Sequence, residues 1–260
     1  LMALLQVMRI FAPNIWGHIA DHSGHRAPIV RSAALVCLIA YLGVFWGTGF
    51  WWLFAVMSLI GFFWSAPLPL VEAITLSHLK ERSDLYGKIR LWGSIGFILV
   101  VLGLGFALDF APIRILLWVV LGLLLGIVLF ARLLPDAPVP SHETEHVPLG
   151  RILRRAEVVA LLVAAILMAA AHGPYYTFFT IHLVDAGYGK GMAGWRWALG
   201  VLCEIGVFLL MPRLLKRVRM ETVLSFTLVA AVLRFLLIGW AVDNLAVLLF
   251  AQTLHAFTFG

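Results

Sequence analysis

The stretch Trp16-Gly-His-Ile-Ala-Asp-His-Ser-Gly-His-Arg26 is a short polar segment between two long apolar runs. Gly17 is small enough to let a helix end pack closely on a neighbour, and Gly24 can adopt a turn conformation that a side chain resists. Asp21 is placed where the next helix begins and can face the positive end of its dipole. The stretch therefore predicts a tight, charged loop between two helices.

The composition around this loop is not that of a soluble domain. Apolar residues make up 63% of the 260 residues and charged residues 12%, whereas soluble domains carry about 25% charged residues. A net charge of +6 could favour nucleic acid. The basic residues, however, lie in short loops between apolar runs, so we expect a multi-pass membrane protein with no nucleic-acid partner.

Apolar segments that approach or exceed the length of a membrane span follow one another along the chain. A bilayer-crossing helix needs about 20 residues, and only the first and last segments are clearly shorter. We expect these two helices to be cut by the ends of the sequence. The sequence predicts an all-α helical bundle with helices at 1–17, 28–48, 51–77, 89–108, 113–134, 156–183, 192–211, 221–242 and 245–260.

Lys and Arg orient this bundle. Nearly all loop Lys and Arg residues fall on one side, and only Arg114, Lys190 and Arg196 fall on the other, so we expect the richer side to be cytoplasmic. The longest loop contains several prolines and charges of both signs, which is typical of a linker. We predict an N-terminal half-bundle over 1–134, a cytoplasmic linker over 135–155 and a C-terminal half-bundle over 156–260.

The pattern Gly17-x-x-Ala-Asp21-x-x-Gly24-x-Arg26 between apolar segments resembles the loop between helices 2 and 3 of the major facilitator superfamily. The resemblance implies a twelve-helix fold, of which this chain covers about helices 2 to 10. It also implies alternating access, in which two halves rock around a midplane site. The loop would then be a gating loop, in which Asp21 loses its contacts as the cytoplasmic side opens.

A few ionisable residues lie inside the predicted spans, where a charge at the helix centre costs at least about 2.5–3.5 kcal/mol. At about 1.5 Å per residue, all except Glu72 are expected within a turn or two of the bilayer midplane. Polar groups at one depth on separate helices predict a water-lined cavity for substrate and coupling ion. The residues are Arg9, Glu72, His172, Glu204, Arg234 and His255.

Each of these residues also has a structural interpretation. Arg9 can be one half of a buried ion pair, His172 can pack beside a proline kink, and His255 can bind a backbone carbonyl. Glu204 is the strongest functional candidate because a carboxylate in hydrocarbon can bind and release a proton, unless Arg234 holds it ionised.

A membrane enzyme that uses His172, Glu204 and His255 around a metal is the alternative from another class. The spacing of these three residues contains neither a His pair at i and i+4 nor an HExxH sequence. We therefore predict that the protein is not an enzyme and that it has no metal and no cofactor.

Three runs sharpen the family resemblance: Tyr86-Gly-Lys-Ile-Arg-Leu-Trp-Gly-Ser-Ile-Gly-Phe97, Gly200-Val-Leu-Cys-Glu204 and Gln252-Thr-Leu-His255. Together they resemble the 3-phenylpropionic acid transporter family, proton symporters akin to lactose permease. The resemblance covers most of the chain. It implies that Glu204, Arg234 and His255 are the proton-coupling group.

Glu72 and Arg90 are similar to the glutamate and arginine that bind sugar in lactose permease. Arg90 offers a rigid donor fork and Glu72 an acceptor, so the pair can clamp a polar ligand. It can equally be a structural salt bridge at a helix start.

The sequence departs from lactose permease at three places. Thr258 replaces a further carboxylate and Gln252 replaces a lysine, so the full proton relay is not implied. Phe97 stands where the sugar-stacking tryptophan would be, which disfavours a galactoside and suits an aromatic or aliphatic acid.

We therefore expect proton-coupled symport of a small organic acid, such as a phenylpropionate-like aromatic acid. The expected protein is a monomer in the lipid bilayer of a bacterial inner membrane, with the proton as coupling ion. Arg9 and Arg90 would attract the anionic head group and Glu72 would orient it. The other expected substrate-binding residues are Phe97, His172 and Tyr176.

Two alternatives stay open for this fold. One is an oligosaccharide or nucleoside proton symporter, and the other is a membrane sensor that does not transport.

Overall fold

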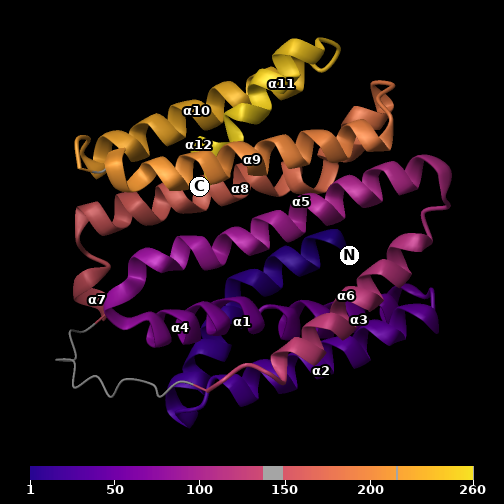
Figure 1. The fold of residues 1–260 in the computed structure, drawn as a ribbon, viewed down its shortest axis with the longest axis vertical. Helices are drawn as coiled ribbons and strands as arrows, with labels where there is room; N and C mark the ends of the chain where they lie inside the picture. Colours follow the sequence, from indigo (N-terminus) through magenta and orange to yellow (C-terminus); the bar gives the residue numbers. More distant parts are fainter. Residues whose placement is uncertain (137–148, 215, 260) are drawn as a thin grey trace. The chain divides into compact units, whose positions relative to one another are not determined.

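The structure, a computed structural model, describes residues 1–136, 149–214 and 216–259. These residues form helices joined by short turns (Figure 1). Within the described ranges, 6 helices are long and apolar enough to cross a membrane. The prediction of an all-α, multi-pass membrane protein is confirmed. The candidate spans are Ala27–Phe45, Phe50–Leu79, Tyr86–Phe110, Ala156–Asp185, Lys190–Met211 and Met220–Trp240.

Contacts divide the described residues into two compact units. Unit 1 comprises residues 1–86 and 114–136, and unit 2 comprises residues 87–113 together with those from 149 onward. Nearly all of α5 (Tyr86–Phe110) thus groups with later helices. The predicted half-bundles stay a prediction, and most of the predicted linker lies outside the described residues.

Unit 1 has a core of small side chains, which let membrane helices approach closely. Ala12 and Ala20 on one face of the first helix are fully buried against the next helices. Trp16, between them, donates a hydrogen bond from Nε1 to the carbonyl oxygen of Phe62 at 2.9 Å. The elements of unit 1 are α1 (Met2–Ser23), α2 (Ala27–Leu42), η1 (Gly43–Phe45), α3 (Phe50–Trp64), α4 (Pro67–Leu79), η2 (Lys80–Leu85) and α6 (Ile115–Ala131).

Two of the predicted helices are interrupted. The expected helix over 51–77 breaks between α3 and α4, and α4 begins at Pro67, where the missing backbone N–H of proline costs no helical hydrogen bond. The expected helix over 245–260 breaks at Leu254. There the Thr253 hydroxyl donates to the carbonyl oxygen of Phe250 at 2.7 Å and competes with the helical backbone bond.

Unit 2 joins α5 to a group of later helices. The helix α9 contacts α8, α11 and α12, and α10 contacts α8, α11 and α12 (Figure 1). Gly194 of α9 meets α5 so closely that a Cβ on it would lie 2.8 Å from the carbonyl oxygen of Val101. The later elements are α7 (Leu149–Ile152), α8 (Ala156–Asp185), α9 (Lys190–Leu214), α10 (Met220–Trp240), α11 (Leu245–Thr253) and α12 (His255–Phe259).

Asp109, near the end of α5, caps the start of α9. Its two carboxylate oxygens accept hydrogen bonds from the backbone N–H groups of Lys190 at 2.9 Å and Gly191 at 3.1 Å. A carboxylate at this end of a helix satisfies unpaired donors and is attracted by the helix dipole. The cap fixes the register between α5 and α9.

Candidate functional site

Most of the polar stretch from Trp16 to Arg26 is helical. The helix α1 continues to Ser23, so the turn itself is short. Gly24 has φ of 70°, and its N–H donates to the carbonyl oxygen of Ala20 at 3.1 Å. The prediction of a turn conformation at Gly24 is confirmed.

Gly17 does not have the packing role that we predicted. Within the part of the chain that the structure describes, a Cβ at this position would meet no atom within 4 Å. The reason is the helical period, since the buried face of α1 carries Ala12, Trp16 and Ala20, which are spaced four residues apart. Gly17 lies off that face.

The carboxylate that caps the start of α2 belongs to Asp136. Its Oδ1 accepts from the N–H groups of Arg26 at 3.1 Å and Ala27 at 3.0 Å, and its Oδ2 lies 3.0 Å from Nδ1 of His25. The prediction for Asp21 was wrong, because Asp21 lies in the last turn of α1. It instead forms an ion pair with Arg26 at 3.6 Å.

Arg31 and Arg26 extend this network across unit 1. Arg31 donates to the carbonyl oxygens of Ala131 at 3.2 Å and Leu134 at 2.7 Å, just after α6 ends. Arg26 donates to the hydroxyl of Ser77 in α4 at 3.2 Å. The loop after α1 therefore ties α2, α4 and the end of α6 together.

The predicted proton-coupling residues all lie inside unit 2. The exposed fractions are 5% for Glu204 on α9, 0% for Arg234 on α10 and 3% for His255 at the start of α12. The His255 ring packs on α9, since a Cβ on Gly200 would lie 2.9 Å from its Cδ2. The charge of Arg90, on α5, acts on Glu204.

Arg234 is held by neutral groups. Its Nη1 donates to Oγ1 of Thr258 at 3.0 Å and lies 3.3 Å from Nε2 of His172. The carbon of its guanidinium lies 4.2 Å above the Tyr175 ring. His172 Nδ1 lies 2.9 Å from the carbonyl oxygen of Met168, so this nitrogen donates and Nε2 is left to accept from Arg234.

Aromatic rings line the same region. Tyr176, a predicted substrate-binding residue, stacks on Trp197 with centroids 5.8 Å apart and planes 13° apart. The Tyr175 hydroxyl lies 3.1 Å from both amide atoms of Gln252, which is fully buried. Trp197 was not among the residues predicted from the sequence, although it stacks on one of them. The amide of Gln252, a polar side chain in an apolar segment three residues before His255, was a usable sign that this part of the chain faces the buried cluster.

The remaining predicted binding residues are distributed over both units. Phe97, on α5 in unit 2, is 42% exposed. Glu72 is half-buried on α4 in unit 1, and Arg9 is exposed on α1 with Nη1 3.4 Å from Oε1 of Gln6. Because Glu72 and Arg90 belong to different units, the predicted clamp between them stays a prediction.

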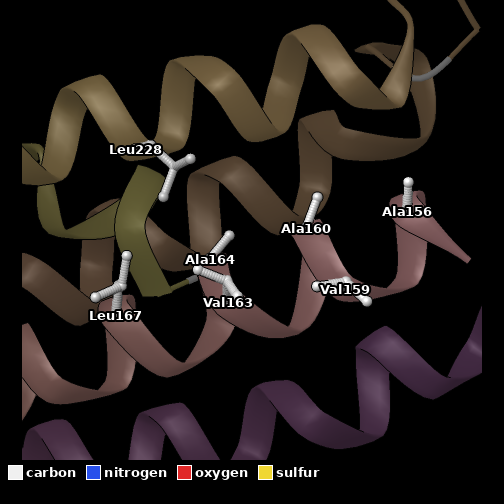
Figure 2. Close-up of a pocket in the computed structure, with 7 residues that line it drawn as sticks. All are labelled: Ala156, Val159, Ala160, Val163, Ala164, Leu167 and Leu228. Atoms are coloured by element: carbon white, nitrogen blue, oxygen red, sulfur yellow. The ribbon is translucent and has the colours of Figure 1, made fainter. Parts of the chain in front are cut away.

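The groove in Figure 2 is a poor candidate for a site that recognises charge. It lies between α8 and α10, has a volume of about 590 Å³, and Leu228 of α10 points toward α8. Aliphatic side chains alone line it, and such surfaces offer no donor to an anion. The lining residues are Ala156, Val159, Ala160, Val163, Ala164, Leu167 and Leu228.

The described part of the chain also lacks a cluster of metal ligands. Among the described residues, no group of three His, Cys, Asp or Glu side chains is placed to hold a metal ion. The side chains of Glu204, Arg234 and His255 themselves can form ion pairs and hydrogen bonds and can exchange protons.

Curated transporters are among the proteins similar to this chain. It is 29% identical over 88% of its length to a probable 3-phenylpropionic acid transporter of Escherichia coli, and it covers 61% of that protein. It is 29% identical over 74% of its length to the maltose permease of Geobacillus stearothermophilus, and it covers 50% of that protein. The chain therefore spans about half to three-fifths of the length of these relatives.

The fold has a counterpart among solved structures. The nucleoside transporter NupG matches 99% of this chain with a TM-score of 0.76 and 19% sequence identity, and 69% of its own chain is covered. A variant of that protein matches with a TM-score of 0.81. At this identity the likeness concerns the fold.

The family is decided by a match over the whole sequence. The family model for the MFS_1-like family covers residues 1–260. The curated relatives and the membrane-length helices agree with it. This chain therefore belongs to the MFS_1-like family of the major facilitator superfamily.

Proposed function

We propose that this protein is a secondary transporter that couples proton movement to uptake of a small organic acid, such as a phenylpropionate-like aromatic acid. The observation that carries the proposal is the burial of Glu204, Arg234 and His255 inside one group of helices. Ionisable groups within membrane spans are costly, and they typically mark substrate and proton pathways. The relatives named as an organic-acid transporter and a maltose permease support the same class.

Glu204 is the proton-carrying group in this proposal. Its carboxylate is buried on α9, and the charge of Arg90 acts on it from α5. When Glu204 takes up a proton, the negative charge facing Arg90 disappears, so Arg90 becomes available to an anion. Proton binding and substrate binding then favour each other, as symport requires.

Arg9 and Arg90 attract the anionic head group in this proposal, and Glu72 orients it. Phe97, Tyr176 and His172 supply rings for an aromatic tail. Ring stacking of this kind contributes about 0.5–1.5 kcal/mol beyond buried area.

The loop Gly17 to Arg26 acts as the cytoplasmic clip. Asp21 and Arg26 form its ion pair, Gly24 provides its turn, and Asp136 holds the start of α2. Opening of the cytoplasmic side breaks the Asp21 contact. We place the protein in a bacterial inner membrane, as a monomer that needs the proton but no other cofactor.

The test is uptake by cells that make the full chain. We expect accumulation of labelled 3-phenylpropionate above the outside concentration, and collapse of the accumulation when the proton gradient is dissipated. Equal uptake with and without the gradient would contradict proton coupling. No movement of any acid, sugar or nucleoside would favour a membrane sensor instead.

A second candidate is a sugar or nucleoside proton symporter. The relative named as a maltose permease favours a sugar, and a relative from Escherichia coli named as a putative nucleoside transporter favours a nucleoside. A competition panel separates the candidates. Inhibition by aryl-propionates supports the acid, whereas inhibition by oligosaccharides or nucleosides alone supports the alternative.

A further inference from the structure

We propose that Arg234 binds the carboxylate of the substrate, whereas Arg9 and Arg90 attract the anion. This inference rests on the proposed transport of an organic acid. It gives Arg234 a role in substrate choice, in addition to its predicted role in proton coupling with Glu204 and His255.

The first observation is a buried cation with no resident anion. Arg234 has an exposed fraction of 0%. Among the described residues, its Nη1 bonds to Thr258 and His172, Tyr175 lies against its guanidinium, and no carboxylate forms an ion pair with it. Buried charges are normally paired, since a charge removed from water without a partner is costly. The missing partner is an anion.

The second observation is the identity of the nitrogens that lack partners. Thr258 and His172 both engage Nη1, whereas Nε and Nη2 have no hydrogen-bond partner among the described residues. Nε and Nη2 form the side edge of the guanidinium, which presents two parallel N–H donors to the two oxygens of a carboxylate. The unused edge therefore matches a carboxylate better than a single hydroxyl.

The third observation is that the fork is held in place. Tyr175 lies under the guanidinium with its ring face, and its hydroxyl is bound to Gln252. Phe235 lies 5.2 Å from the guanidinium carbon. Cation–π contact and the two bonds to Nη1 fix the plane of the group, which lowers the ordering cost of binding a planar anion.

The charges then balance during transport. A carboxylate on Arg234 and a proton on Glu204 leave the site with no added charge, which favours crossing of an apolar layer. The ligand class is a small monocarboxylate. Neutral sugars and nucleosides would leave Arg234 buried without a counter-charge.

The test compares 3-phenylpropionate with its neutral amide, 3-phenylpropanamide, in the full chain. Binding of each is measured by competition in membranes that contain equal amounts of transporter. Truncating one partner of a buried charged pair costs about 2–5 kcal/mol, so Arg234→Gln should lower the preference for acid over amide by at least about 30-fold. Arg234→Lys keeps the charge but loses the fork, and should recover part of the preference.

Arg196 offers the matched control. It is as fully buried as Arg234 and also stacks on a tyrosine, with its guanidinium carbon 3.9 Å from the Tyr188 ring. Its Nε, Nη1 and Nη2 all lack a hydrogen-bond partner among the described residues, so, unlike in Arg234, no bond to Nη1 orients the side edge toward a carboxylate. Arg196→Gln should keep the preference for the acid. If Arg234→Gln fails to reach the membrane, Arg234→Lys carries the comparison.

The outcomes separate this proposal from the one on which it rests. If the unaltered protein binds no monocarboxylate, the proposed function fails. If it binds 3-phenylpropionate but the Arg234 variants keep the acid preference, or Arg196→Gln loses it equally, the assignment of Arg234 is overturned while acid transport stands.

Discussion

Asp136 shows how one side chain can fix a loop of this protein. It accepts from two backbone N–H groups at the start of α2 and lies against His25. Asp21, the more conspicuous acid in the sequence, makes an ion pair with Arg26 and is largely exposed. A buried or helix-capping carboxylate contributes more than an exposed ion pair.

We therefore predict that Asp136→Ala destabilises the protein more than Asp21→Ala does. Loss of the cap should cost about 1–2 kcal/mol, and loss of the exposed pair about 0–1 kcal/mol. Thermal unfolding of both variants in the same detergent measures the difference. Equal Tm values for the two variants would contradict the assignment of Asp136 as the cap.

Sequence alone could predict some residues of the site and not others. Glu204, Arg234 and His255 could be found because an ionisable residue inside an apolar span is rare. Asp136 could not be assigned, since its partners lie 109 to 111 positions away along the chain. Trp197 was missed for the same reason, because its neighbours Tyr175 and Tyr176 come from another helix.

Helix ends are the next scale at which sequence and structure can be compared. Hydropathy located the spans, but it missed the break before Pro67, which takes the favoured proline position at the start of α4. This signal was present in the sequence. The contact between α5 and α9 was not, because which helices touch depends on the fold as a whole.

That contact predicts different effects for two glycines of α9. A Cβ on Gly194 would lie 2.8 Å from a backbone oxygen of α5, whereas a Cβ on Gly206 would meet nothing within 4 Å in the described structure. Gly194→Ala should cost about 1–3 kcal/mol through overpacking. Gly206→Ala should be neutral or stabilising by up to about 1 kcal/mol, because alanine favours helix.

Thermal unfolding followed by tryptophan fluorescence measures both variants. The expected order of Tm is Gly206→Ala at or above the unaltered protein, and Gly194→Ala below it. A Gly194→Ala variant as stable as the unaltered protein would show that α5 and α9 do not touch at this point.

At the scale of the whole molecule, composition was sufficient for the class of protein. Long apolar segments and one-sided Lys and Arg predicted a multi-pass bundle, and the family match over 1–260 agrees. How the helices group into compact units is harder to predict from the sequence. The sequence places α5 with the earlier helices, while its contacts group it with α9.

Coupling of proton and substrate at Glu204 is the central claim, and substrate-driven proton flux measures it most directly. Proteoliposomes with the full chain, loaded with a pH indicator, receive 3-phenylpropionate without an imposed gradient. We expect proton entry with the unaltered protein and with Glu221→Gln, a control at an exposed carboxylate of α10.

Glu204→Gln should abolish this proton entry and uphill uptake, while exchange of labelled for unlabelled substrate continues. Retained exchange shows that the variant is folded and binds substrate, so the loss can be assigned to the proton. Undiminished proton entry with Glu204→Gln would contradict the account.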